Sequence, residues 1–515
     1  MKLREENIHG KEDKVMKFWK VMVIFSVLLF IPAYSYSTTL GDLRISYLEG
    51  DIQVRTEDTS DWVPAAINMP LRAGDRLWVP DGGRAEINLR DGTYVRLDQG
   101  SALDILATEG DAFQFYLSAG HAYVNFRGAR SKVLQLDTPV SSVRAYDRSR
   151  FRVDLSPDGF TQVSVLTGSV YAESRNGRTR VRSGKTLFLR DDAYADITPL
   201  GPSDEWEQWN GERDRRLSER RYSYQYLPEE LSPYSYDFDE YGRWTYTNDY
   251  GYVWSPTVVV SSGWAPYRTG RWVWIGNDYV WISYEPWGWA PYHYGRWSFL
   301  ASIGWCWVPP LRGDVYWGPG YVGWVSTPTY VSWIPLAPGD IYYGHGYYGK
   351  NSVNITNVNV TNITTVYKNV YVNNGVTTIS KDTFLTGRPV PVRVTENPFV
   401  GRPIPPGRPS LSPVRETRVP MIKDISTAKL PPQPLRDVQV KSLMQERPLV
   451  REQNRSVMKP GSTPKDLPVR GMTAPGTSKG GEVQRTGKPP VTPGGEVQRT
   501  GKPPVTPGGE VQRTG

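Results

Sequence analysis

Cysteine is almost absent from this 515-residue sequence, in which Cys306 stands alone. One cysteine cannot form a disulfide within a chain or supply a thiolate metal cluster. Histidine is nearly as scarce. The four are His9, His121, His293 and His345, and no two of them have the spacing of a metal-ligand pair. The sequence therefore predicts no metal site and no cofactor, and Cys306 is expected to be a small buried side chain.

Enzyme motifs are also missing. The sequence has no Gly-x-Ser-x-Gly, no phosphate-binding loop and no dinucleotide-binding glycine motif. A glycan hydrolase needs two carboxylates at a fixed separation. Asp237, Asp239 and Glu240 cluster where solvent exposure is the simpler expectation, and Glu285 has no acidic counterpart in neighbouring repeats. We expect no catalytic activity, with a glycan-active enzyme as the least favoured alternative.

A net positive charge is absent from most of the chain, although the formal net charge of the whole is +8. Residues 386–515 contain 22 Lys+Arg against 10 Asp+Glu, which leaves the remainder slightly acidic. Nucleic-acid binding requires a basic face on a folded module. No such face is evident, so no nucleic-acid partner is expected.

One apolar run is present, from Val21 to Ala33, and three lysines precede it. Its length is that of a signal-peptide core and is short for a membrane span. Residues 1–37 are predicted to be a signal peptide or, alternatively, an uncleaved N-terminal anchor, and translation could begin at Met16. The protein is therefore expected in the periplasm or cell envelope, either exported or anchored in the inner membrane by residues 21–33. The membrane is a partner only through this segment, and only if it is not cleaved.

Between residues 41 and 199 the sequence alternates short strands with turn signals. Ala85–Leu89 and Tyr94–Leu97 alternate apolar and polar residues as half-buried strands do, and Asp91-Gly92 between them is a turn signal. No amphipathic helix of useful length occurs in this range. It is predicted to be an all-β domain.

Short motifs follow one another through this domain: Gly50–Val54, Leu71–Leu77, Gly83–Ile87, Leu136–Pro139, Thr161–Val165 and Ser183–Lys185. Their order resembles the FecR-type periplasmic domain. The resemblance implies an extracytoplasmic, β-rich and partly solenoid-like domain. In iron-transport regulators this domain relays a signal from an outer-membrane receptor toward a sigma factor, and a cytoplasmic sigma-binding module precedes their membrane span. The segment before Val21 is expected to be too short for such a module.

A charged connector is predicted over residues 200–231. The stretch 205–221 is charged almost throughout and is the one plausible helix of this part of the chain. We expect it to be solvated on all sides, as a link between two domains.

The next region, residues 232–340, is rich in tryptophan: fourteen of the 19 lie between Trp244 and Trp333. Gly-Arg-Trp occurs three times, beginning at Gly242, Gly270 and Gly295, and each copy opens a unit with aromatic residues at alternating positions on both sides of a short turn. This pattern predicts a β-hairpin repeat whose rings share one face. The region resembles a tryptophan-rich domain of unknown function that follows FecR-type domains in other exported bacterial proteins, a resemblance that implies no known activity.

Two uses of these rings remain open. A packed hairpin core is the commoner outcome, because an exposed aromatic face of this size would promote aggregation. The alternative is a platform on which sugar rings stack, with arginines available to a carboxylate. The candidate ligand-binding residues are Trp272, Trp274, Trp281, Trp287, Trp289, Tyr292, Tyr294, Arg271 and Arg296.

The rest of the chain changes composition twice. Residues 341–385 form an Asn/Val/Thr-rich segment that is predicted to be β, with a strand pair around Asn373-Asn374-Gly375. Residues 386–515 hold 23 of the 43 prolines and no tryptophan, and a 14-residue repeat begins at residue 480. Such a segment cannot bury enough apolar surface to offset its chain entropy. A disordered, cationic, Pro-rich tail is expected.

These features predict a non-catalytic, exported envelope protein with an interaction or scaffold role. In this interpretation the aromatic repeat binds a cell-wall polymer, an acidic envelope polysaccharide or an envelope protein. The alternative is an extracytoplasmic sensory or signalling component of FecR type without the cytoplasmic sigma-binding module. The sequence does not give the oligomeric state.

Overall fold

The computed structural model describes residues 40–59, 61–128, 132–175, 177–190, 195–219, 222–257, 263–356, 366–401, 406–436, 438–451 and 469–471. The apolar run at 21–33, His9 and the repeats from residue 480 lie outside these ranges. Within them, no helix combines the length and the apolar character that crossing a bilayer requires.

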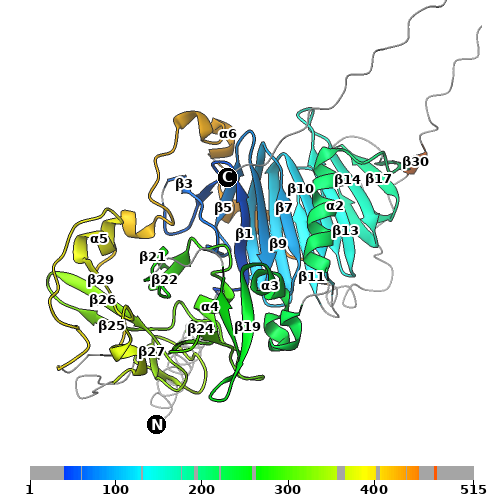
Figure 1. The fold of residues 1–515 in the computed structure, drawn as a ribbon. Coiled ribbons are helices and arrows are strands. Elements are labelled where there is room, and N and C mark those ends of the chain that lie inside the picture. Colours follow the sequence, from blue (N-terminus) through cyan, green and yellow to red (C-terminus); the bar gives the residue numbers. More distant parts are fainter. Residues whose placement is uncertain are drawn as a thin grey trace, which may run out of the picture. The chain divides into compact units, whose positions relative to one another are not determined.

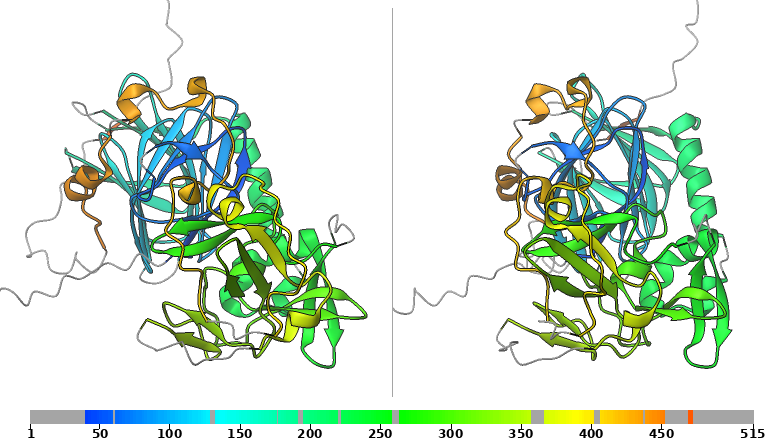
Figure 2. Two further views of the ribbon diagram at one scale, coloured as in Figure 1. Left: turned by 90° about the vertical axis from the view of Figure 1, so that its left-hand side faces the viewer. Right: turned by 60° about the vertical axis from the view of Figure 1, so that its left-hand side comes forward.

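Two sheets form the first domain, residues 43–199 with one short strand added from residues 469–471, and Figures 1 and 2 show their strands as two layers. In sheet order, the ten-stranded sheet consists of β30 (Val469–Gly471), β18 (Ala195–Pro199), β17 (Lys185–Leu189), β14 (Thr161–Thr167), β13 (Ser149–Leu155), β10 (His121–Phe126), β7 (Tyr94–Leu97), β6 (Arg84–Leu89), β1 (Leu43–Glu49) and β4 (Pro70–Leu71). The nine-stranded sheet consists of β16 (Gly177–Arg182), β15 (Ser169–Ser174), β12 (Ser142–Ala145), β11 (Val133–Asp137), β9 (Ala112–Ala119), β8 (Ser101–Glu109), β5 (Arg76–Val79), β2 (Gln53–Arg55) and β3 (Val63–Pro64).

The chain crosses from one sheet to the other after every one or two strands, and this winding gives the domain its partly solenoid-like character. Alternation within each strand builds the core between the layers. In the hairpin of β6 and β7, Ile87 pairs with Val95, and both side chains are fully buried. The predicted turn joins these strands, with Thr93 N donating to Asp91 Oδ1 over 2.9 Å. The all-β prediction for this domain is confirmed.

Helix α2 (Glu205–Ser218) follows β18, and the predicted helix is present. The expectation of a fully solvated connector is wrong, however. Trp206, Asn210 and Asp214 recur every fourth residue and are buried. They face the ten-stranded sheet, along which α2 lies in Figure 1. Because most residues of α2 are charged, the narrow buried face formed by these three residues was not evident from the sequence.

Hairpins make up most of the Trp-rich domain, residues 232–340. The short helices η1 (Ser223–Gln225), η2 (Glu229–Tyr234) and α3 (Ser235–Tyr241) precede the first of them. The three predicted hairpins are present: β19 (Gly242–Thr247) with β20 (Gly251–Pro256), β21 (Gly270–Ile275) with β22 (Asp278–Ser283), and β23 (Arg296–Leu300) with β24 (Gly304–Val308). A fourth joins β25 (Val322–Ser326) to β26 (Tyr330–Pro335), and the helix α4 (Ala290–His293) precedes β23. The first and third hairpins share one sheet through β20 and β24.

The segment after the hairpins is less regular than predicted. It contains β27 (Tyr342–Gly344), β28 (Ser352–Asn354), η3 (Lys368–Tyr371), β29 (Thr377–Ser380) and α5 (Lys381–Thr386). The expected strand pair around Asn373-Asn374-Gly375 does not form, because η3 precedes this turn and β29 pairs with β26 instead.

Part of the predicted tail has a defined path. Its described residues include η4 (Glu416–Arg418), η5 (Thr427–Lys429), α6 (Gln433–Arg436) and α7 (Val440–Glu446), and residues 406–451 contact the folded domains. The expectation of disorder from residue 386 therefore does not describe this stretch. Hydrogen bonds from side chains of the first domain to main-chain carbonyl groups fix the position of this stretch. The apolar content of a sequence does not reveal contacts of this kind.

Candidate functional site

The tryptophans and tyrosines of the hairpins form the core of the Trp-rich domain. Trp272, Trp274, Trp281, Trp287, Trp289, Tyr292 and Tyr294, all proposed above as ligand-binding residues, are buried, and the most exposed of them is Trp274 at 9%. They pack on one another: the Trp272 ring centroid lies 4.4 Å from that of Trp324 and 5.3 Å from that of Trp281. Covered rings do not offer the open faces that stacking on a sugar requires.

The two candidate arginines also have internal roles. Arg271 is buried and donates through Nη2 to the carbonyl of Glu416 over 2.9 Å. Arg296 lies flat on Tyr321, with Cζ 3.8 Å from the ring centroid, and it reaches the wall of a cleft that is described below. Of the nine candidate residues, only Arg296 lines a cleft that could bind a ligand.

The repeated Gly-Arg-Trp motif has a packing explanation. A side chain on Gly242 would place its Cβ 2.2 Å from the Trp254 ring on the opposite strand. The same distance would be 2.7 Å from Gly270 to Trp281 and 2.8 Å from Gly295 to Trp307. In each hairpin an indole thus lies directly against the glycine backbone. The motif marks a structural repeat and not a chemical one.

Three of the four acidic residues considered for catalysis are held by partners, and the fourth, Glu240, is exposed. Glu285 accepts hydrogen bonds from Tyr292 Oη over 2.5 Å and Trp264 Nε1 over 2.8 Å, and burial raises its pKa. Asp239 accepts from Ser223 Oγ over 2.7 Å and is not a free surface acid. Asp237 pairs with Arg44 of the first domain. The expectation that Asp237 and Asp239 are solvated is wrong, because both carboxylates fix neighbouring segments.

Cys306 and His293 are buried as well. Cys306 lies between Trp305 and Trp307 on β24, and burial raises the pKa of its thiol to about 12, which leaves no reactive thiolate. His293 stacks on Trp317, and burial lowers its pKa to about 4, so the imidazole is neutral at pH 7. Among the residues that the structure describes, no three His, Cys, Asp or Glu side chains gather as a metal site would need.

An open cleft of about 840 Å³ lies beside the aromatic core. Six tyrosines line it: Tyr226, Tyr250, Tyr252, Tyr316, Tyr321 and Tyr348. Tyr252 and Tyr316 expose 45% and 36% of their surface, unlike the indoles of the core. Charged residues of both signs complete the wall: Arg296, Arg312, Lys350, Asp249 and Asp314. Sequence reasoning missed this cleft, because its residues come from strands and loops far apart in the chain.

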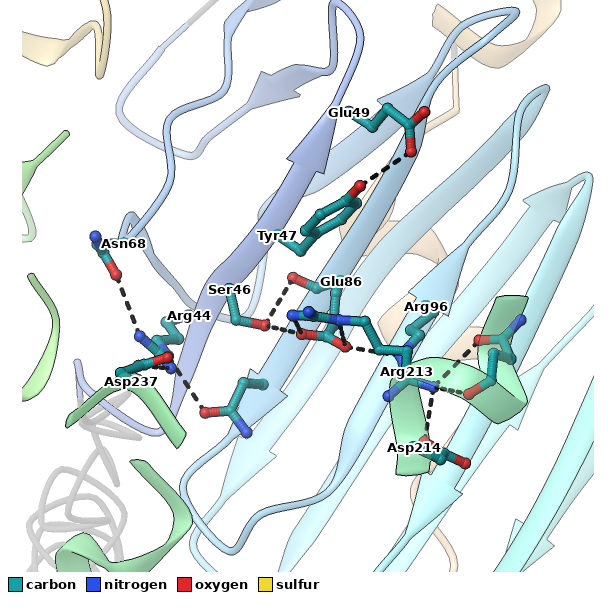
Figure 3. Close-up of polar contacts among 12 residues, drawn as sticks. Arg44, Ser46, Tyr47, Glu49, Asn68, Glu86, Arg96, Arg213, Asp214 and Asp237 are labelled. Carbon is teal, nitrogen blue, oxygen red and sulfur yellow. Dashed lines mark hydrogen bonds and ion pairs between the residues drawn. The ribbon is translucent and has the colours of Figure 1, made fainter. Parts of the chain in front are cut away.

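A buried charge network joins α2 to the first domain (Figure 3). The carboxylate of Glu86, on β6, forms ion pairs with Arg96 of β7 over 2.7 Å and with Arg213 of α2 over 2.8 Å. Arg96 continues to Asp214 of α2 over 2.8 Å. Burial alone would raise the pKa of Glu86, but the two guanidinium groups lower it to about 2. The carboxylate is therefore ionised inside the protein, and α2 supplies one of its two counter-charges.

A second buried contact extends to the Trp-rich domain (Figure 3). Arg44 on β1 donates through Nη2 to Asp237 of α3 over 2.7 Å and through Nη1 to Asn68 over 3.2 Å. Asn68 in turn donates to the carbonyl of Glu285 over 2.7 Å. One cluster of polar side chains thus contacts two segments of the Trp-rich domain.

The first domain also has a groove of about 900 Å³ that His121 lines. His121 Nδ1 lies 2.7 Å from Asp154 Oδ1, and Arg152 Nε lies 2.8 Å from the same oxygen. Arg152 continues to Asp204, whose other oxygen caps α2 by accepting from Glu207 N over 2.8 Å. The groove is connected to the start of the same helix.

Comparison with known families now places both domains. Residues 75–171 match the family described as FecR protein. The chain carries a FecR domain. Residues 235–340 match a family of unknown function, DUF6600. Both resemblances expected from the motif order are confirmed. Glu86, Arg96, His121 and Asp154 all belong to the FecR domain, and the indole core belongs to the DUF6600 domain.

Two crystal structures of a candidate anti-sigma factor from Parabacteroides distasonis ATCC 8503 resemble part of the chain, each with 20% identity and a TM-score of 0.23. The similarity covers 24% of this chain and 59% of that protein. With so low a TM-score it carries no argument. The comparison with curated proteins finds no match.

Proposed function

We propose that this chain is a non-catalytic, extracytoplasmic sensory component of FecR type, which passes on a signal through protein–protein contact. The FecR domain at residues 75–171 is the observation that carries the proposal. Its Glu86 and Arg96 bind α2 through buried ion pairs. A partner that moves β6 or β7 would therefore also move α2.

The proposed location is the periplasm or cell envelope. FecR-type domains are extracytoplasmic, and the apolar run at residues 21–33 would serve as an export signal or an anchor. Action without catalysis is proposed because Asp237, Asp239 and Glu285, three of the four acids considered for hydrolysis, are engaged in contacts within the protein.

Transcript measurements in the cells that encode the protein would test the sensory role. Deletion of the gene should change a defined set of transcripts, and the wild-type chain should restore them. Arg213→Met should restore them poorly, because it releases α2 from Glu86 while Arg96 still pairs with that carboxylate. Arg215→Met, on the exposed side of α2, is the matched control. An unchanged transcript profile in the deletion strain would contradict the proposal.

The tyrosine cleft supports a second function for the Trp-rich domain, the binding of an acidic envelope polysaccharide. Tyr252 and Tyr316 are half-exposed rings on which sugars can stack. Arg312 and Lys350 lie on the same wall and would attract carboxylates. This is the predicted interaction role, moved from the buried indoles to exposed tyrosines.

Titration of the full chain with polygalacturonate, followed by calorimetry, would test this second function. Tyr252→Ala and Arg312→Ala should each weaken binding by about tenfold, as expected for one lost stacking or ionic contact of about 1.4 kcal/mol. Tyr371→Ala, which removes an 82% exposed ring outside the cleft, should bind as wild type. Equal weakening in all three variants would exclude the cleft. Release of reducing ends would instead indicate hydrolysis, with Asp249 and Asp314 as the carboxylates to replace.

A further inference from the structure

Side chains of the nine-stranded sheet bind main-chain carbonyl groups of a distant part of the chain. We call residues 423–451 the strap. Trp78 Nε1 and Gln53 Nε2 both donate to the carbonyl of Lys429, over 3.0 Å and 2.5 Å. Further along, Arg76 donates to the carbonyls of Leu435 and Val438 over 2.8 Å and 3.2 Å. These donors come from the neighbouring strands β2 and β5.

The same pattern continues on the next strands of this sheet. Gln114 on β9 donates to the carbonyl of Arg447 over 2.5 Å, and Gln135 on β11 donates to that of Pro448 over 3.3 Å. Gln135 Oε1 also accepts from Val450 N over 3.1 Å. Side chains of β2, β5, β9 and β11 thus form a row of polar groups that binds a peptide backbone.

Acidic side chains flank this row and meet basic residues of the strap. Lys423 Nζ lies 2.6 Å from Asp51 Oδ1 at one end, and Arg451 pairs with Glu109 and Asp111 at the other. These ion pairs are partly exposed, and pairs of this kind contribute little to stability. Their charge pattern nevertheless selects a basic segment over an acidic one.

The strap contributes little apolar burial of its own. Among its described residues, Pro431 is the one buried side chain, and the rest are half-buried or exposed. Leu449 of the strap is partly buried against Ala112, Val133 and Tyr146, whereas Val419 and Met421, just before the strap, pack against the main core of the first domain. A segment bound through carbonyl groups and exposed ion pairs can be replaced by another of different sequence, because neither contact requires a particular apolar side chain.

We propose that this face of the first domain is a binding surface for a basic segment of a partner protein, and that the strap occupies the surface until such a segment displaces it. Only the biological role of the partner rests on the proposed sensory function; the binding surface itself does not. Because the strap belongs to the same chain, it competes with a partner segment at a high effective concentration. A partner segment therefore binds weakly to the intact protein and strongly once the strap is loosened.

Binding of a dye-labelled peptide of residues 423–451 to the purified full-length chain tests this proposal, with fluorescence anisotropy as the readout. In the double variant Lys423→Glu/Arg451→Glu the strap loses its ion pairs to Asp51 and Glu109, and like-charge repulsion from Asp51, Glu109 and Asp111 replaces them. We expect this variant to bind the peptide at least about tenfold more tightly than wild type. The reason is that the strap leaves the surface free in a larger fraction of the molecules. Arg388→Glu/Arg393→Glu, with the same change in charge at exposed sites outside the strap, should match wild type.

A second pair of substitutions tests the surface itself. Adding Gln53→Leu and Trp78→Phe to the loosened variant removes both donors to one carbonyl and preserves most of the apolar volume. Peptide binding should then weaken by about tenfold, which corresponds to about 1.4 kcal/mol. An unchanged affinity in this variant would overturn the proposal.

Hydrogen exchange of the wild-type chain supplies a readout that does not depend on these variants. Saturating peptide should speed exchange of the strap amides, because the peptide takes their place. If those amides exchange as slowly as the domain core with and without peptide, the strap is a permanent part of the fold and the proposal fails. No signalling readout enters these measurements, so their outcome is independent of the proposed sensory function.

Discussion

Arg213 of helix α2 binds both carboxylate oxygens of Glu86, with Nε 3.0 Å from Oε2 and Nη2 2.8 Å from Oε1. Glu86 is fully buried, and Arg96 of β7 completes its neutralisation. A bidentate pair of this kind fixes the rotation of the helix as well as its position. Helix α2 is thereby bound to the FecR domain and is not a free linker.

Removing the shared carboxylate should strongly destabilise the first domain. Glu86→Gln leaves the charges of Arg96 and Arg213 buried beside a neutral amide, and breaking a buried pair typically costs about 3–5 kcal/mol. Urea unfolding followed by circular dichroism measures this loss. Glu212→Gln, on the solvent side of α2, is the control and should show no measurable change. Equal stability of Glu86→Gln and wild type would show that the network is energetically neutral.

The same carboxylate predicts an acid-sensitive stability. Burial opposes ionisation of Glu86, but Arg213 and Arg96 lower its pKa from 4.5 to about 2. A depressed folded-state pKa adds stability that is complete above about pH 4.5 and is lost as the pH falls toward 2. The free energy of unfolding, measured at intervals across this window, should fall more steeply in wild type than in Glu86→Gln.

His293 predicts a loss of stability in a higher pH window. Burial lowers its pKa from 6.5 to about 4, so the unfolded chain binds a proton more readily than the folded chain. Stability should therefore fall as the pH drops from about 6.5 to about 4, with no further loss from this residue below that. In His293→Asn this slope should disappear from the unfolding free energy, whereas His345→Asn, at an exposed position, should retain it.

His121 should show the opposite pH dependence. Its hydrogen bond to Asp154 raises its pKa above 6.5. A raised folded-state pKa adds stability that is fully present below about pH 6.5 and is lost as the pH rises through the folded pKa. His121→Asn should therefore lower the melting temperature more at pH 5.5 than at pH 8. The effect should be small, because 38% of the side chain is exposed. A loss independent of pH would show that protonation of His121 does not matter.

Glycine substitutions test the explanation of the Gly-Arg-Trp motif. Gly242→Ala would place a methyl group 2.2 Å from the Trp254 ring, and overpacking of this kind costs about 1–3 kcal/mol. Gly211→Ala, in the exposed middle of α2, meets no atom within 4 Å and should stabilise the chain by about 0.5–1 kcal/mol. Thermal unfolding of the two variants should show shifts of opposite sign. A neutral Gly242→Ala would mean that Trp254 moves aside without cost.

Sequence patterns predicted the local structure well and the contacts of polar residues poorly. Alternating apolar positions such as Ile87 and Val95 predicted strands, since strand side chains alternate between faces. Glu86 and Arg96 occupy the other face of those strands, where exposure was the natural expectation. Their burial depends on α2, more than a hundred residues away along the chain. The recurrence of Trp206, Asn210 and Asp214 every fourth residue was the one available sign of it.

The aromatic residues show the same division. Rings at alternating positions around short turns predicted hairpins whose Trp272 and Trp281 lie opposite each other. The pattern could not decide whether their shared face is open or covered, because that depends on other hairpins. Trp324, on the fourth hairpin, covers Trp272. The half-exposed rings Tyr252 and Tyr316 were inconspicuous in the sequence.

The sequence by itself determined what depends on neighbouring residues: the all-β character, the FecR motif order, the hairpin repeat and the scarcity of metal ligands and nucleophiles. These follow from strand periodicity, turn chemistry and composition, which act over a few residues. Only the tertiary structure decided which rings are core, which acids are paired and where residues 423–451 lie. Those outcomes depend on contacts between segments far apart in the chain, such as Trp78 with the carbonyl of Lys429, and no local pattern encodes them.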